Sequence, residues 1–369
     1  MRRVTVINGP NLNMLGVREP EVYGATTLTD LDAMIVVWGD RLGLEVTTFQ
    51  SNHEGDLIDR IQACRTDADG IVINPGAYTH TSYAIHDALL AAAVPAVEVH
   101  LSNIHAREPW RSVSVIAPAV VRSIFGRGIV GYKDALRLLV NRASAPPETV
   151  AYGDHPEQVI DLRLPDGLGP GRVAVFLHGG FWRREWQRDG IDTLAVDLTG
   201  RGWVTANVEY RRLGCDGGWP ATAEDVATAI DRVVADTGAD RVTVIGHSAG
   251  GQLALVAGRS PRVEAVAAAA PITDLARAVE LGIGAPSPQA FLGGADPRGP
   301  VSPITDPPSI RQILVHGLGD TVVPVEFSER YAAVAEAAGI DVMAVYPDLG
   351  HFELLDPGRA VWEQVVAAL

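Results

Sequence analysis

Short runs of apolar, often β-branched residues recur through the first third of the chain, and stretches with apolar residues at helical spacing separate them. Such runs are typical of buried strands, and their alternation with helical patterns is typical of βαβ units. The expected strands cover residues 4–7, 46–49, 70–73, 96–99 and 113–116. The pattern therefore predicts an α/β domain with a flavodoxin-like sheet of five parallel strands.

The same alternation resumes after a segment with the composition of a linker. The helical pattern near Lys133 runs into residues 143–147, where small residues and two adjacent prolines indicate a linker. We therefore place the first domain at residues 1–142, the linker at 143–151 and a second α/β domain at 152–369. Its strands are expected at residues 159–164, 173–177, 204–208, 242–245, 263–270, 313–315 and 342–346, with helices such as 222–236 between them.

The composition fits two packed domains without a nucleic-acid surface. Apolar residues make up 47% of the 369 residues and charged residues 20%, which is ordinary for globular domains. Residues 1–142 hold 13 Lys and Arg against 15 Asp and Glu, and the rest of the chain holds 17 against 30. A phosphate-binding surface needs clustered positive charge, so we expect no nucleic-acid partner.

No membrane span or export signal is readable in the sequence. The first apolar run, residues 4–7, is too short for a signal peptide, and longer runs such as 88–97 are too short to cross a bilayer. Cys64 and Cys215 are the chain's two cysteines, and they lie in different domains, which favours free thiols in a reducing compartment. We therefore expect a cytoplasmic protein whose partners are small molecules.

Polar residues follow three of the expected strands in the first domain. They occupy residues 8–11, 74–82 and 98–103, and a longer loop at 15–24 has the length of a lid over the same edge. Ligands of open parallel sheets bind beyond the carboxyl ends of the strands, so these loops should meet in one site. A single histidine such as His80 is more often a packing residue than a catalyst, but several polar loops at one edge indicate a binding site.

These loops carry the motifs NGPNLNMLG, REPEVYG, FQSNHEG, NPGAYTHTS, EVHLSNIHAREPWR and GRGIVGY. In this order they closely resemble the type II 3-dehydroquinate dehydratases, with no visible departure from the family pattern. The resemblance implies dehydration of 3-dehydroquinate to 3-dehydroshikimate in the shikimate or quinate pathway, by anti elimination through an enolate, without a metal or an organic cofactor. It also implies a homo-oligomer, in which trimers assemble into a dodecamer.

The resemblance assigns roles to individual residues. Tyr23 is the expected base that removes the C2 proton, with Arg18 beside it. Asn11 is expected to hold a water that stabilises the enolate oxygen. His100, positioned by neighbours such as Glu98, is expected to protonate the departing hydroxyl. The expected substrate-binding residues are Asn74, His80, Leu101, Ser102 and Arg111, together with Asp87 from a neighbouring subunit.

The residue types fit this chemistry. Tyrosine has a pKa of about 10 in water, so it acts as a base near neutrality only where cations favour the phenolate. Arg18 and Arg107 are the available cations. The type I enzyme needs a Schiff-base lysine, and Lys133, the only lysine, begins the last expected helix of the domain. A flavodoxin-type FMN module is the alternative from another class, but the Ser/Thr-rich phosphate loop that it needs after the first strand is replaced by Asn-Gly-Pro-Asn.

A tight glycine turn follows one strand of the second domain. The expected strand at 242–245 runs into the motif GHSAG and then into a helical pattern, which is the arrangement of a nucleophile elbow. Ser248 is therefore the expected nucleophile. The N–H groups of Gly179 and Gly180, in the stretch HGGFW, and that of Ala249 are the expected oxyanion hole.

The expected acid and base lie farther along the chain. Asp320 follows the strand at 313–315 and His351 follows the strand at 342–346, which gives the order Ser, Asp, His of α/β-hydrolases. The other candidates, which we interpret as supporting residues, are His247, Asp274 and His316.

The stretch HGGFW resembles the signature of arylformamidase (kynurenine formamidase) and related small esterases. The resemblance implies hydrolysis of a carboxylic ester or formamide through an acyl-enzyme, in which His351 takes the proton of Ser248 and Asp320 orients His351. The segment between Asp274 and Ile310 is long enough for only a modest cap. The alternative interpretation is a catalytically silent second domain that acts as a scaffold or interaction module beside an active dehydratase.

Overall fold

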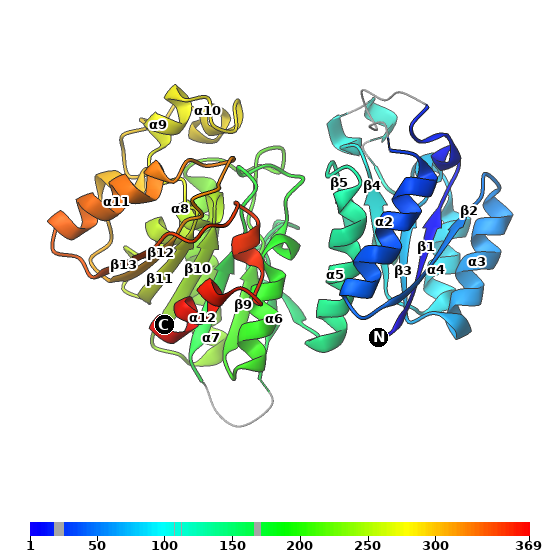
Figure 1. The fold of residues 1–369 in the computed structure, drawn as a ribbon, viewed down its shortest axis with the longest axis horizontal. Helices are drawn as coiled ribbons and strands as arrows, with labels where there is room; N and C mark the ends of the chain where they lie inside the picture. Colours follow the sequence, from blue (N-terminus) through cyan, green and yellow to red (C-terminus); the bar gives the residue numbers. More distant parts are fainter. Residues whose placement is uncertain (18–25, 107, 112, 166–170) are drawn as a thin grey trace. The chain divides into compact units, whose positions relative to one another are not determined.

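The computed structural model of the protein describes residues 1–17, 26–106, 108–111, 113–165 and 171–369. These residues form two compact units, Met1–Ser144 and Ala145–Leu369, and each unit has a central sheet with helices on both faces (Figure 1). In the described parts of the chain no helix is long and apolar enough to cross a membrane.

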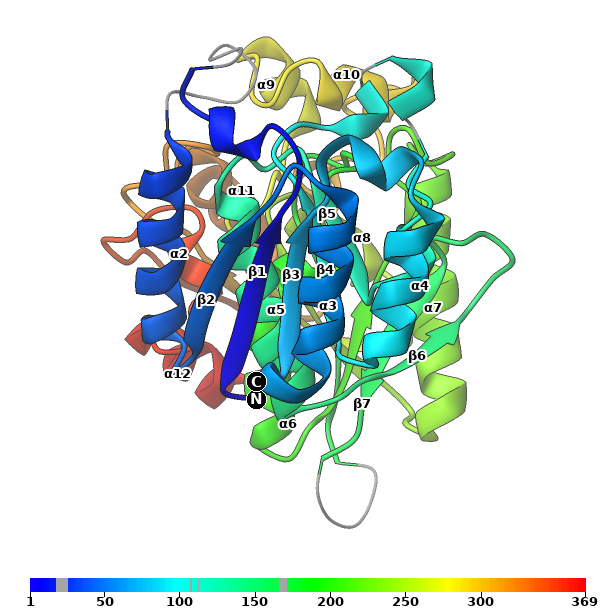
Figure 2. The same cartoon turned by 90° about the vertical axis from the view of Figure 1, so that its right-hand side faces the viewer.

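The first unit contains the predicted five-stranded sheet, and all of its strands are parallel. The strand order is β2-β1-β3-β4-β5. The bounds are β1 Arg3–Asn8, β2 Glu45–Gln50, β3 Gly70–Asn74, β4 Ala96–His100 and β5 Arg122–Phe125. Helices α2 (Leu28–Arg41) and α5 (Val130–Ser144) pack on one face of the sheet, and α3 (Glu54–Asp67) and α4 (Tyr83–Ala92) pack on the other (Figure 2). The flavodoxin-like fold is confirmed.

The fifth strand does not lie at residues 113–116, where the apolar pattern predicted it. That segment is a loop: Val113 is 63% exposed, and its carbonyl and that of Val115 accept hydrogen bonds from the rings of His80 and His86. Its peptide groups are therefore bonded to the neighbouring loop and helix rather than to a strand. The fifth strand of the sheet is β5, which pairs with β4. It forms no apolar run because it begins with the polar residues Arg122 and Ser123.

The second unit contains the predicted α/β-hydrolase sheet of mostly parallel strands. The order is β13-β12-β11-β10-β8-β9-β7-β6, and the pairs β7–β9 and β6–β7 are antiparallel. The bounds are β6 Glu148–Ala151, β7 Val159–Arg163, β8 Val173–Leu177, β9 Val204–Val208, β10 Val242–His247, β11 Val263–Ala269, β12 Arg311–Val315 and β13 Val342–Val345.

Strand β6 lies in the segment that we predicted as a linker. Three of its four side chains are exposed, so no apolar run marked it, and it pairs with β7 at the edge of the sheet. Only Ala145, Pro146 and Pro147 separate β6 from the end of α5.

Helices cover both faces of the second sheet. Helices α7 (Ala221–Thr237), α8 (Ala249–Ala257) and α11 (Glu326–Ala337) pack on one face, and α6 (Asp192–Gly200) and α12 (Ala360–Ala368) pack on the other. Two short helices, α9 (Leu275–Glu280) and α10 (Ser287–Leu292), lie between β11 and β12, in the segment predicted as a modest cap.

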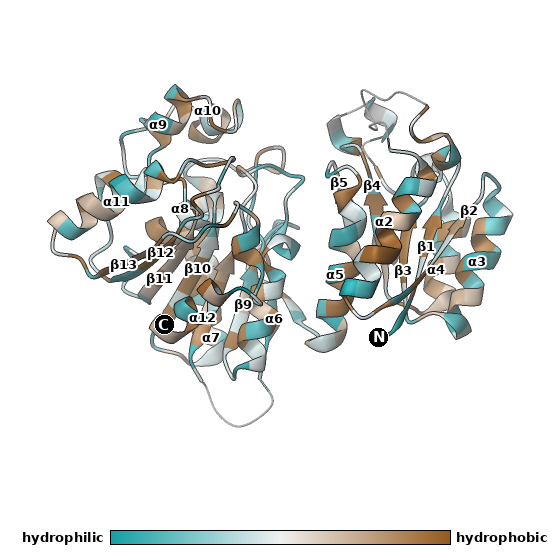
Figure 3. Cartoon of the chain, viewed as in Figure 1, coloured by the Kyte–Doolittle hydropathy of each residue, from teal (hydrophilic) through white to brown (hydrophobic). Residues whose placement is uncertain are grey.

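Short 3-10 helices complete the two units at Leu12–Met14, Gly76–His80, Ile104–Ala106, Pro109–Arg111, Ala117–Ala119, Arg188–Gly190, Pro303–Thr305 and Glu353–Leu355. The most hydrophobic residues gather on the central strands and on the helix faces turned toward them (Figure 3). The predicted site residues lie at the carboxyl ends of the strands or in the loops that follow them.

Candidate active sites

A pocket of about 210 Å³ opens at the carboxyl edge of the first sheet. The residues predicted for substrate binding or catalysis that line it are Asn11, Asn74, His80, His100, Leu101, Ser102 and Arg111. Tyr23 and Arg18, and also Arg107, lie outside the described residues. Asp87 is exposed on α4 and does not line the pocket of its own unit.

The loops after β1 and β3 meet at the point where the strand order reverses, as expected for an open parallel sheet. Gly9 passes so close to the next loop that a Cβ there would lie 2.6 Å from the Pro75 carbonyl oxygen. Gly76 has a φ of 58° and packs against the Pro10 carbonyl. Glycine is therefore required at both positions for the two loops to form one floor of the pocket.

Glu98 and His100 form a buried pair at the end of β4. The Nε2 atom of His100 donates to Glu98 Oε1 over 2.9 Å, and the Glu98 side chain is fully buried. Burial by itself would raise the pKa of Glu98, but hydrogen bonds from His100, Ser123 and Thr79 outweigh it and hold the pKa below its usual value. Ser114 donates to both carboxylate oxygens. Glu98 is therefore a carboxylate, and Nδ1 is the ring atom that His100 leaves for a ligand.

Tyr132 of α5 joins the two asparagines that end β1 and β3. Its hydroxyl donates to Asn8 Oδ1 over 2.6 Å and accepts from Asn74 Nδ2 over 3.0 Å. Asn74 Oδ1 in turn accepts from the backbone N–H of Gly76. Burial raises the pKa of Tyr132, so its hydroxyl stays protonated. Tyr132 lies within the motif GRGIVGY. Its role in positioning Asn74 was missed because only the fold brings the start of α5 to these strands.

His80 and Arg111 flank Trp110 at the side of the pocket. His80 Nδ1 donates to the Val113 carbonyl over 2.7 Å, and its ring meets the Trp110 ring edge-on. Burial lowers the pKa of His80, which favours the neutral ring with Nε2 free to accept. The Arg111 guanidinium stacks 4.0 Å over the Trp110 ring. The pocket thus combines a cation with neutral hydrogen-bonding groups, which suits a hydroxylated anion.

Comparison with known proteins decides the family of this unit. Residues 2–140 match the family model for class II dehydroquinases. A stretch of 135 residues, 37% of this chain, is 56% identical to catabolic 3-dehydroquinase 1 of Neosartorya fischeri and covers 90% of it. A stretch of 145 residues, 39% of this chain, is 50% identical to the 3-dehydroquinate dehydratase of Bacillus pumilus and covers 99% of it. The chain belongs to the class II dehydroquinases. Met1–Ser144 is called the dehydroquinase unit below.

Beyond the dehydroquinase unit, the sharp turn between β10 and α8 carries Ser248. Ser248 has a φ of 57° and a ψ of −118°, a backbone conformation that is unusual for a residue with a side chain. A Cβ at Gly246 would lie 2.1 Å from the Gly250 carbonyl oxygen, and one at Gly250 would lie 2.1 Å from the Leu177 carbonyl oxygen. The small residues therefore allow the predicted nucleophile elbow, and the Ser248 hydroxyl does not cap its own helix.

His351 and Asp320 are hydrogen-bonded to each other. The distance from His351 Nδ1 to Asp320 Oδ2 is 2.6 Å. The backbone N–H groups of Val322 and Val323 donate to Asp320 Oδ1. Burial alone would raise the pKa of Asp320, but hydrogen bonds from His316 and His351 hold it below its usual value. Asp320 is therefore ionised and orients the ring of His351.

His247, His316 and Asp274, the other candidate residues, have contacts of their own. His247 Nε2 donates to the His351 carbonyl over 3.1 Å, which ties His351 to the residue before Ser248. Burial lowers the pKa of His247 well below its usual value, so this ring is neutral. His316 lies 3.3 Å from Asp320, whereas Asp274 caps α9 by accepting from the Arg277 N–H.

The predicted oxyanion hole lies beside the elbow. A Cβ on Gly179 would lie 3.0 Å from Ser248 Cβ, so the loop after β8 passes directly over the nucleophile. Gly180 has a φ of 110°, which favours glycine. Within the described residues, the N–H groups of Gly180 and Ala249 have no acceptor. Both are available to an oxyanion.

The second unit also has relatives. The BD-FAE family model matches residues 160–270, and that of the prolyl oligopeptidase family matches residues 220–365. A truncated carbohydrate esterase from gut microbiota aligns with a TM-score of 0.52 and 21% identity, over 60% of this chain and 93% of that chain. An acetyl ester-xyloside bifunctional hydrolase from Caldicellulosiruptor lactoaceticus aligns with a TM-score of 0.52 and 20% identity, over 60% of this chain and 94% of that chain. These likenesses show the α/β-hydrolase fold.

Proposed function

We propose that the dehydroquinase unit converts 3-dehydroquinate into 3-dehydroshikimate by anti elimination through an enolate. The observation that carries the proposal is the buried Glu98–His100 pair at the edge of a pocket lined by Asn74, His80 and Arg111. With Nε2 held by the Glu98 carboxylate, Nδ1 is the atom of His100 that passes a proton to the departing hydroxyl.

The remaining roles follow the family motifs. Tyr23 removes the C2 proton with Arg18 beside it, and Asn11 holds a water at the enolate oxygen. The substrate carboxylate and hydroxyls bind to Asn74, His80, Leu101, Ser102 and Arg111, and neither a metal nor an organic cofactor takes part. The test is the absorbance of the conjugated product when the full chain is mixed with 3-dehydroquinate; an absence of turnover would contradict the proposal.

We also propose that the dehydroquinase unit assembles into trimers and then into a dodecamer. Asp87 lies on α4 with Tyr83 and Leu90, at the i, i+4 and i+7 spacing of one helix face. Tyr83 is 68% exposed and Leu90 is 56% exposed within one chain. An apolar helix face that carries Asp87 supports its proposed entry into the site of a neighbour. The free, buried Cys64 and Cys215 support a cytoplasmic location.

For the second unit, we propose hydrolysis of a carboxylic ester or formamide through an acyl-enzyme. Ser248 attacks, His351 takes its proton, Asp320 orients His351, and Gly179, Gly180 and Ala249 hold the oxyanion. The observation that carries this proposal is the His351–Asp320 pair beside a strained serine turn.

An aromatic pair beside the base supports an aryl substrate. Phe352, which follows His351, is 53% exposed and stacks on Trp186 with the ring centroids 5.7 Å apart and the planes 8° apart. A flat apolar surface at this place suits an aryl acyl group or an aryl leaving group. The test combines phosphonate labelling with a panel of aryl esters and formamides. An unlabelled chain that hydrolyses none of them would favour the silent scaffold instead.

A further inference from the structure

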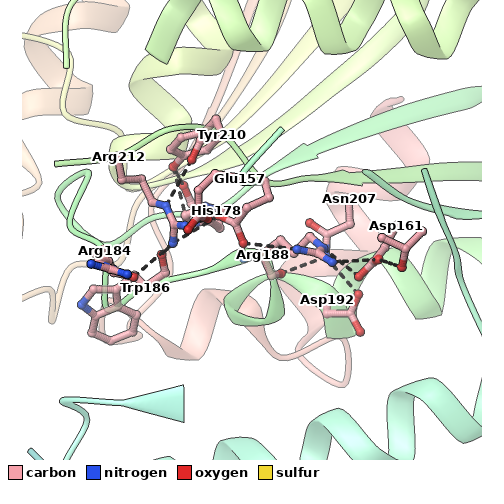
Figure 4. Close-up of polar contacts among 12 residues, drawn as sticks. Glu157, Asp161, His178, Arg184, Trp186, Arg188, Asp192, Asn207, Tyr210 and Arg212 are labelled. Carbon is pink, nitrogen blue, oxygen red and sulfur yellow. Dashed lines mark hydrogen bonds and ion pairs between the residues drawn. The ribbon is translucent and has the colours of Figure 1, made fainter. Parts of the chain in front are cut away.

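A cluster of buried charges lies beside the loop that carries the oxyanion hole. It contains four acids, three arginines and one histidine; we call Glu157, Asp161, Arg163, His178, Arg188, Asp192, Glu209 and Arg212 the ion cluster. Figure 4 labels all of these residues except Arg163 and Glu209. All except Glu157 are less than a tenth exposed. Charges are costly to bury, and an apolar core would serve stability as well. The ion cluster therefore calls for a role beyond stability.

Glu209 connects the arginines of the ion cluster to His178. Its Oε2 accepts from the backbone N–H of Arg188 over 3.1 Å, and its Oε1 lies 3.3 Å from Arg212 Nη1. Arg188 itself is paired twice with Asp161, over 2.8 and 3.0 Å. Burial alone would raise the pKa of Glu209, but the charges of Arg212 and His178 hold it far below its usual value. Glu209 is therefore an anion that can only accept hydrogen bonds.

Both ring nitrogens of His178 face acceptors. Nε2 lies 2.9 Å from Glu209 Oε1, and Nδ1 lies 2.8 Å from the carbonyl oxygen of Gly179. The Tyr210 ring stacks on the histidine ring at 4.4 Å, and the Tyr210 hydroxyl donates to the His178 carbonyl. Neither Glu209 nor the Gly179 carbonyl can donate, so in both of these contacts the ring nitrogen of His178 is the donor. The Tyr210 hydroxyl also lies 3.5 Å from Nδ1.

We propose that His178, held at Nε2 by Glu209, clamps the Gly179 carbonyl through Nδ1 and so aims the Gly180 N–H at the oxyanion. In a trans peptide the carbonyl of one residue and the N–H of the next point to opposite sides. Holding the Gly179 carbonyl toward His178 therefore turns the Gly180 N–H away from it. That N–H has no acceptor in the described part of the chain, and Gly179 lies so close to Ser248 that a Cβ on it would be 3.0 Å from Ser248 Cβ. His178 and Glu209 are thus positioning residues, and this role rests on the proposed hydrolase function.

The test uses two substitutions of His178 that keep different donors. In His178→Asn the side-chain amide nitrogen takes the place of Nδ1 and can still hold the Gly179 carbonyl. In His178→Gln it takes the place of Nε2, so Glu209 keeps a donor but the carbonyl is released. We expect His178→Gln to lower kcat for an aryl ester about 10- to 100-fold with little change in KM, because an oxyanion donor acts mainly in the transition state. His178→Asn should recover most of this loss.

Glu209→Gln tests the other half of the proposal, with Asp192→Asn as the matched control. An amide at 209 places an NH₂ group against a donor of either Arg188 or Arg212, so the carboxylate that holds His178 Nε2 is lost. Its kcat should fall as in His178→Gln, and inhibition by an aryl boronic acid, which forms a tetrahedral adduct, should weaken by the same factor. Asp192 is as buried as Glu209 but pairs with Arg163 and does not touch His178. Asp192→Asn should change kcat less than about threefold.

Each outcome separates this inference from the proposed function. Dehydration of 3-dehydroquinate by the same samples reports on the dehydroquinase unit, and phosphonate labelling of Ser248 reports on the folding of the second unit. The His178 pair decides the question where Glu209→Gln does not fold. Two results would overturn the clamp but not the hydrolase function. In the first, the wild type hydrolyses the ester and His178→Gln has the same kcat; in the second, His178→Asn and His178→Gln lose kcat equally. A wild-type chain that neither hydrolyses esters or formamides nor takes a phosphonate label would overturn the hydrolase function, and the clamp with it.

Discussion

Glu98 accepts a hydrogen bond from His100 Nε2 over 2.9 Å, and three hydroxyl groups also donate to its carboxylate. These four donors stabilise the negative charge of Glu98. The hydroxyls belong to Thr79, Ser114 and Ser123, which come from three different segments. This arrangement fixes the orientation of the ring that faces the pocket.

Replacement of Glu98 by Gln should lower dehydration about 10- to 100-fold, because the general acid His100 loses the carboxylate that holds its Nε2. The appearance of the conjugated product is the readout, and ester hydrolysis by the same sample should be unchanged. Ser123→Ala, which removes one donor but keeps the charge, is the matched control and should have a smaller effect. Equal rates for wild type and Glu98→Gln would remove His100 from the role of acid.

Acid should weaken the dehydroquinase unit through the same carboxylate. The pKa of Glu98 is lower in the folded chain than its ordinary value of 4.5, so the unfolded chain takes up the proton first as the pH falls. The stabilisation is therefore complete above a pH of about 4.5 and is lost as the pH falls toward the folded pKa. Urea unfolding at several acidic pH values should show a larger loss in wild type than in Glu98→Gln. Parallel curves for the two proteins would contradict it.

Replacement of Tyr23 by Phe should abolish dehydration, because the general base is lost while the apolar ring is kept. A loss of about a hundredfold or more is expected for a general base. Retention of more than about a tenth of the activity would be incompatible with this role.

Borohydride added with 3-dehydroquinate should leave the wild-type enzyme active, because the mechanism forms no imine on Lys133.

Replacement of Ser248 by Ala should remove the hydrolysis of an activated aryl ester and leave dehydration unchanged. The residual rate should be at least about a thousandfold lower, since the nucleophile of a triad carries most of its rate enhancement. Phosphonate labelling followed by mass measurement identifies the modified residue. A label on another serine, or an unchanged rate in Ser248→Ala, would disprove the assignment.

The chain should assemble through the α4 face that carries Asp87. Light scattering should give a particle of about 470 kDa, for twelve chains of 39.2 kDa. Leu90→Glu, which places a charge on the same face, should yield smaller particles with reduced dehydration, whereas Asp59→Ala on α3 should change neither. An active monomer would exclude both the assembly and the role of Asp87, and an active trimer would exclude only the dodecamer.

The sequence predicted most of the strands and the loops that follow them, because apolar runs and glycine turns are local signals. It did not predict β5 or β6, whose polar or exposed side chains form no apolar run. The hydroxyls around Glu98 and the Tyr132 bridge were also missed, because their spacing along the chain has no period. Only the folded loops bring them together.

The His178–Glu209 pair could have been predicted from the sequence and was not. The two residues are 31 positions apart, but each directly follows a strand. Strands β8 and β9 are parallel neighbours in which Leu177 pairs with Val208. The residues that follow two paired strand ends must lie side by side, so a histidine and a glutamate at these positions indicate a contact.

The short connection between α5 and β6 limits how the gene can change. Ala145, Pro146 and Pro147 are the only residues between a helix whose Tyr132 holds the first pocket and a strand that completes the edge of the second sheet. A deletion that extends beyond these three codons removes either the last turn of the helix or a paired strand residue. Insertions between α5 and β6 should therefore be tolerated far more easily than deletions.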